Sequence, residues 1–190
     1  LEIDTVNTGY TLSFSSGALT GATSNSFNIT QAPATQLVFT QDPTDAVAGV
    51  AIAPDITVEF RDANNNLVST ETSTVTLAFG TDPSSGSATL GGTVAQAAVG
   101  GVATFNDITV DLANTGYTLS ATSGALTPGT SASFNITAAA ASQLAFSVEP
   151  SDASQNTAIA PSIEVQILDA FGNLTTSTDS VTLSINNNAG

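Results

Sequence analysis

A long internal repeat constrains the fold of this chain more than any other feature. Residues 7–20 read NTGYTLSFSSGALT, and residues 114–127 read NTGYTLSATSGALT. Between 7–30 and 114–137, 19 of 24 positions are identical, and the copies begin 107 residues apart. Short solenoid repeats have periods of about 20 to 50 residues. A period of about 107 residues therefore indicates tandem domains.

The repeat continues on both sides of these phrases and sets a frame. Residues 35–69 align with 142–176. The frame predicts the C-terminal part of a preceding repeat at 1–31, a complete repeat at 35–137, and the N-terminal part of a following repeat at 141–190. We therefore expect the chain to begin and end inside repeats.

Strands are expected throughout, because apolar and polar residues alternate in short runs bounded by turn residues. No segment shows a capped helical stripe. In the complete repeat the predicted strands are 36–40, 55–61, 75–79, 87–90, 102–105, 108–112, 117–122 and 131–137. Eight short strands in about 100 residues are typical of an antiparallel β-sandwich.

The only two tyrosines, Tyr10 and Tyr117, occupy the same place in the phrase GYTLS. A tyrosine at the start of a late strand is typical of a tyrosine corner, in which the hydroxyl bonds back to the backbone across a Greek-key arch. The alternative is an ordinary half-buried aromatic side chain. Either interpretation gives both tyrosines a structural role.

Three motifs resemble those of bacterial Ig-like tandem repeats in large secreted and surface-attached proteins, similar in style to invasin and filamin modules. They are GVATF at 101–105, GYTL at 116–119 and DAFGNL at 169–174. The resemblance implies tandem Ig-like sandwiches of Greek-key topology, an extracellular or cell-surface location, and a role as spacer, stalk or adhesin. In DANNNL, Asn65 replaces the usual Gly, which the left-handed tolerance of Asn can accommodate.

The charge is strongly one-sided: sixteen acidic residues face one basic residue, Arg61, for a formal net charge of -15. Neutralising phosphates requires Lys and Arg, so we expect no nucleic-acid partner. No apolar run of about 20 residues is present, so we expect no membrane insertion. The expected partners are neighbouring repeats of the same chain or other copies of it.

Catalysis is not expected, because the chain has no His, Cys or Lys and so lacks the usual bases and nucleophiles. A pair of carboxylates could hydrolyse glycosides. Sugar sites usually offer aromatic platforms as well, and this chain has no Trp. We therefore predict that the protein is not an enzyme and holds no organic cofactor.

Calcium is the one cofactor considered, because carboxylate and carbonyl oxygens are abundant. Asp62, Asn64 and Asn66 alternate like the start of an EF-hand loop, but Leu67 stands where Gly is required and Ser73 where Glu is required. The alternative interpretation is an Asx-rich hairpin turn.

A second calcium candidate lies near the linker at 31–35, where Asp42 and Asp45 could bind an interdomain ion. Three Asn-x-Thr sequons, at Asn28, Asn135 and Asn173, are glycosylation candidates. Their alternative explanation is the general abundance of Asn and Thr.

The favoured function is a stalk or scaffold segment of a long extracellular protein or fibre. Incomplete repeats at the ends would expose unpaired edges, and strand complementation between them could polymerise the chain. The alternative is a ligand-binding adhesin module that recognises glycans or a host surface.

Overall fold

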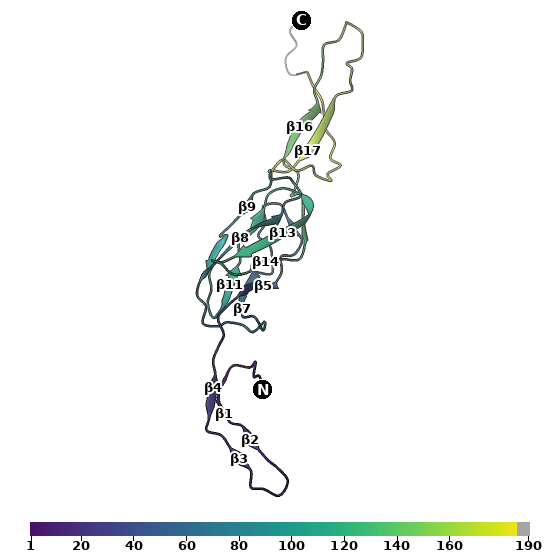
Figure 1. Cartoon of the computed structure of the whole chain (residues 1–190). Helices are drawn as coiled ribbons and strands as arrows, with labels where there is room; N and C mark the ends of the chain where they lie inside the picture. The colour runs from purple at the N-terminus through teal and green to yellow at the C-terminus, as the bar shows by residue number, and fades with distance from the viewer. Residues whose placement is uncertain (186–190) are drawn as a thin grey trace.

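The computed structural model describes residues 1–185, and within this range the chain contains strands and turns but no helix. The all-β class predicted from the alternating pattern is therefore confirmed. No described segment meets the requirements of a membrane-spanning helix. The chain forms a densely packed central unit (Figure 1). Two strand pairs precede this unit in the sequence, and one strand pair follows it.

The central unit contains two principal sheets. One has the order β10-β8-β13-β15-β6, with β14 also paired to β13, and the other has the order β11-β7-β5. The strands of the first sheet are β6 (Ala46–Val47), β8 (Thr74–Thr81), β10 (Ala95–Ala97), β13 (Asn114–Thr122), β14 (Gly129–Thr130) and β15 (Phe134–Thr137). Those of the second are β5 (Gln36–Gln41), β7 (Ile56–Arg61) and β11 (Val102–Phe105). A short pair, β9 (Leu90–Gly91) and β12 (Thr109–Val110), completes the unit.

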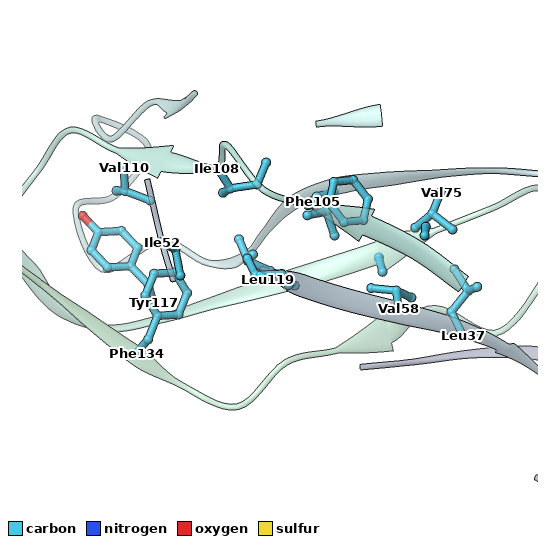
Figure 2. Close-up of a cluster of buried hydrophobic side chains, with 14 of the residues drawn as sticks. Leu37, Ile52, Val58, Val75, Phe105, Ile108, Val110, Tyr117, Leu119 and Phe134 are labelled. Atoms are coloured by element: carbon cyan, nitrogen blue, oxygen red, sulfur yellow. The ribbon is translucent and has the colours of Figure 1, made fainter. Parts of the chain in front are cut away.

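Period-two alternation explains how the two sheets enclose a core. In β7, Ile56, Val58 and Phe60 are fully buried, while the residues between them are partly exposed. Val75 in β8 and Leu119 in β13 are buried in the same cluster (Figure 2). Burying each large apolar side chain contributes about 1.5 to 3 kcal/mol. The arrangement is consistent with a β-sandwich.

The core is confined to the middle of the chain. Every buried hydrophobic side chain among residues 1–185 lies between Leu37 and Ile136. The N-terminal segment forms the pairs β1 (Asn7–Tyr10) with β4 (Phe27–Ile29) and β2 (Ser13–Phe14) with β3 (Ala22–Thr23). The C-terminal segment forms one pair, β16 (Gln143–Val148) with β17 (Glu164–Leu168). These pairs form backbone ladders without a core of their own.

The strand predicted at 87–90 is wrong apart from Leu90. Side chains take the backbone donors that a ladder would need: the N–H of Ala88 donates to Ser84 Oγ at 2.7 Å, and that of Thr89 donates to Asp111 Oδ1 at 2.7 Å. The prediction also missed β6, β10 and β14. These strands have only two or three residues and contain small side chains, so they carry no alternation of large apolar residues.

Candidate functional site

The most distinctive polar structure lies where the central unit meets the segments before and after it. It centres on two loops, 62–67 after β7 and 169–174 after β17, which we call the junction loops. They occupy the same position in successive copies, 107 residues apart. Each begins with a buried Asp: Asp62 is 2% exposed and Asp169 is 0% exposed.

In the first junction loop, Asp62 caps the turn. Its Oδ1 accepts hydrogen bonds from the N–H groups of Asn64 at 2.9 Å and Asn66 at 2.8 Å. Its Oδ2 accepts another from Asn66 Nδ2 at 3.1 Å. Asn65 adopts the left-handed conformation, with φ of 66°, in the position where Gly172 has φ of 87°. This is the geometry of an Asx-rich turn.

The second junction loop repeats this bonding around Asp169. Its Oδ1 accepts from the N–H groups of Phe171 at 2.8 Å and Asn173 at 2.9 Å. Its Oδ2 accepts from Asn173 Nδ2 at 2.8 Å and also from the N–H of Ala139 at 2.8 Å, in the linker at 138–142 between β15 and β16. The second loop is therefore tied to its linker as well as to itself.

These bonds favour the ionised form of both aspartates. The hydrogen bond from the Asn66 N–H lowers the pKa of Asp62, with further bonds from the Asn66 amide and the Asn64 N–H outweighing the opposing effect of burial. For Asp169, burial acts to raise the pKa, but the Asn173 side chain and three backbone N–H groups outweigh it and leave the pKa below its ordinary value. Both carboxylates act as anionic acceptors inside their loops.

Asn173 joins the second loop to the central unit. Its Oδ1 accepts a hydrogen bond from the N–H of Ala113 at 2.8 Å, and its Nδ2 donates to the carbonyl oxygen of Asp111 at 2.8 Å. The side chain is only 7% exposed. The amide thus binds a two-sided backbone site on the central unit.

That backbone site belongs to a tyrosine-corner arrangement. Tyr117 Oη donates to the carbonyl oxygen of Leu112 at 2.9 Å, and the equivalent Tyr10 Oη donates to that of Thr5 at 3.0 Å. The Tyr117 ring lies close to Phe134, at a centroid distance of 5.8 Å (Figure 2). Burial raises the pKa of Tyr117, with nearby acidic groups adding to the effect.

The first junction has an equivalent but weaker connection. Asn66 Nδ2 donates to the carbonyl oxygen of Asp4 at 3.2 Å, the counterpart of the bond from Asn173 to Asp111. The linker residue Gln31 adds to it, because its Nε2 donates to Leu67 O at 2.5 Å and its Oε1 accepts from Thr70 Oγ1 at 3.2 Å.

The other calcium candidates, Asp42 and Asp45, join distant parts of the central unit. Asp42 Oδ1 accepts from the N–H of Ala132 at 2.8 Å. Asp45 accepts from the N–H of Asn135 at 2.7 Å and from its Nδ2 at 3.2 Å. No group of three or more acidic, His or Cys side chains suited to a metal ion occurs among residues 1–185. Calcium binding, to these residues or to Asp62, Asn64 and Asn66, stays a prediction.

The three sequons occupy different environments. Asn28 is exposed and Asn135 is half-buried, and each Oδ1 accepts from a glycine N–H at 3.0 Å. In Asn173, by contrast, Nδ2 already donates to both Asp111 and Asp169. A glycan on Asn173 would require the loop to leave the preceding repeat.

The sequence predicted Asn173 only as a glycosylation candidate, and its hydrogen bonds to Asp111 and Ala113 were not predicted. The available signal was the spacing Asp-x-x-x-Asn, present at the same place in both copies. In comparisons with known proteins, no family model and no curated protein sequence matches this chain.

Proposed function

We propose that the chain is a structural segment of a long extracellular surface protein or fibre, built from tandem Ig-like β-sandwiches of Greek-key topology and acting as a stalk or scaffold. The observation that carries this proposal is the repeated junction. An Asn amide bonds to an Asp carbonyl at Asn66–Asp4 and again, 107 residues later, at Asn173–Asp111. A spacer needs such a defined connection at every step, whereas an isolated binding module does not.

The chemistry of the acidic residues supports a structural role. The carboxylates of Asp42, Asp45, Asp62 and Asp169 accept backbone hydrogen bonds within the fold. With a formal net charge of -15, successive repeats repel one another electrostatically. Such repulsion favours a soluble, extended array.

Exposed apolar side chains on the C-terminal segment favour a second version of this function, polymerisation by strand complementation. Leu144 is 57% exposed and Leu183 is 64% exposed, and both line a hollow of about 120 Å³ that also contains Phe146 and Val165. Their counterparts Leu37 and Leu77 are buried in the complete repeat. We propose that the C-terminal half of a repeat, from the same long chain or from another copy, covers this face.

Negative-stain electron microscopy of the native material, with and without a calcium chelator, tests the proposal. We expect unbranched strings of beads, each about 30 Å along its strands, because β13 has nine residues and the rise is about 3.4 Å per residue. Regular thicker fibres would favour complementation. Compact particles without a repeating unit would contradict both versions and favour the adhesin alternative. Collapse of the strings in chelator would show that calcium stiffens them.

A further inference from the structure

We infer that the junction loop is a docking element that fixes each repeat on the one before it, and that the residue pair at positions 49 and 171 determines which repeats fit together. The loop of one repeat forms the first half of this interface. A backbone arch and a glycine of the preceding repeat form the second half. This inference goes beyond a spacer role, because it says which repeats can be neighbours. It applies equally to a stalk and to a fibre.

The polar half of the interface depends on the tyrosine corner. Tyr117 holds the carbonyl oxygen of Leu112 toward the interior at 2.9 Å. The groups on either side, Asp111 O and the Ala113 N–H, are both bonded to Asn173. A primary amide matches this acceptor and donor pair, whereas Asp in place of Asn would put a second acceptor against a carbonyl oxygen.

The same loop also holds the linker. Asp169 Oδ2 accepts from the Ala139 N–H, and Asp169 O accepts from Gln143 Nε2 at 2.7 Å. Asn173 Nδ2 connects the two parts by donating to Asp169 Oδ2. One partly buried network therefore joins the preceding repeat, the linker and the following repeat, and this restricts their relative motion.

The apolar half of the interface is specific to this junction. The ring of Phe171 lies against Gly49, and a Cβ built on Gly49 would overlap the ring. Gly49 has φ of 73°, a left-handed conformation in which Asn is the usual substitute for Gly. In the next copy its counterpart is Asn156, which indeed has φ of 62°. The counterpart of Phe171 in the first loop is Asn64, a smaller polar residue.

These substitutions define a rule for neighbouring repeats. A loop with Phe at this position packs its ring closely only on a repeat with Gly at the position of Gly49, because a Cβ there would displace the ring. A repeat with Asn there, such as the one containing Asn156, fits only a loop with a smaller residue, such as Asn64. Repeats of nearly identical sequence would therefore not be interchangeable in order.

Distance measurements by electron paramagnetic resonance test this inference on the full chain. The sequence has no Cys, so spin labels attached to Ala78→Cys in β8 and Gln166→Cys in β17 report only the second junction. Both positions are exposed. We expect one narrow distance distribution for the parent chain. Removing the amide in Asn173→Ala should broaden it, since each lost hydrogen bond lowers the docked-to-undocked ratio by roughly 2- to 10-fold.

The pairing rule is tested by a double-variant cycle. Gly49→Asn should broaden the distribution because of the overlap with the ring, and Phe171→Asn should leave it narrow because Asn173 still docks. The combined variant should be narrow again. The pairing rule would be overturned if the combined variant had a distance distribution as broad as that of Gly49→Asn alone. It would also be overturned if circular dichroism showed the combined variant to be as unfolded as Gly49→Asn.

Asn66→Ala is the matched control, since it removes the equivalent amide at the other junction. It should leave the distribution between the labels unchanged. The junction loop would not be the docking element in either of two cases. One is a distance distribution for Asn173→Ala as narrow as that of the parent chain, and the other is a distribution for Asn66→Ala broadened as much as that for Asn173→Ala.

Discussion

The central unit and the N-terminal segment share their local hydrogen bonds but not their burial. The N–H of Leu119 donates to Ser131 Oγ at 2.9 Å, and the N–H of Leu12 donates to Ser24 Oγ at 2.9 Å. Leu119 is fully buried, whereas Leu12 is only half-buried. The phrase common to both copies therefore specifies the turn and ladder geometry by itself. Burial requires the other strands of the central unit.

The C-terminal segment shows the same separation. β16 pairs with β17 as β5 pairs with β7, and in both pairs the register shifts at the equivalent place, after Phe146 and after Phe39. Yet Ile159 is 43% exposed, while its counterpart Ile52 is 1% exposed. An isolated strand pair is marginally stable in water. Stability should therefore differ much more between the regions than their hydrogen bonds do.

The largest expected difference is between Phe134→Ala and Phe27→Ala. Phe134 is 1% exposed and packs on Tyr117, so its truncation should lower the free energy of unfolding of the central unit by about 3 to 5 kcal/mol. Phe27 is half-buried, lies beside the half-buried Tyr10 and does not belong to the central core, so its truncation should leave that transition unchanged. Urea unfolding followed by circular dichroism measures both. Equal losses would mean that the N-terminal segment shares the central core.

A smaller difference is expected between Tyr117→Phe and Tyr10→Phe. The first leaves the partly buried Leu112 carbonyl without its hydroxyl partner and should cost about 1 to 3 kcal/mol of unfolding free energy. It should also broaden the distance distribution across the second junction, because Leu112 lies between the two groups bonded to Asn173.

Tyr10→Phe is the matched control for that experiment. Its hydroxyl bond to Thr5 is at an exposed site, where water can replace it. We expect no change in the unfolding of the central unit. A cost equal to that of Tyr117→Phe would show that the N-terminal segment unfolds together with the central unit.

The smallest effect is expected from acid. The pKa of Asp169 is lowered in the folded state, so its contribution to stability is complete above the unfolded-state pKa of about 3.9 and is lost as pH falls through the folded-state pKa below it. The second junction should loosen in that range, as a broader distance distribution. The variant Asp169→Asn should have a broader distance distribution already at neutral pH, and its distribution should change less as the pH falls. If the distance distribution of the parent chain did not change below about pH 4, the ionised carboxylate of Asp169 would not stabilise the second junction.

Much of the fold was predictable because its determinants are local. Alternation predicted the strands around Val58 and Leu119, and the tolerance of Asn for left-handed backbone anticipated the φ of 66° at Asn65. The partner of Asn173 was not predictable, because it lies in another repeat and consists of backbone groups. The fit of Phe171 on Gly49 likewise depends on how two repeats are placed in space.

The most direct test of the central claim is residue-resolved hydrogen exchange of the amides of Leu119 and Leu12 in the full chain. Both donate to a serine hydroxyl at 2.9 Å, so bond length alone predicts similar protection. We predict that Leu119 exchanges only through global unfolding and is protected roughly a thousand-fold or more above Leu12, which exchanges by local opening. Equal protection would contradict the account, because it would show that the N-terminal segment is held as firmly as the central unit.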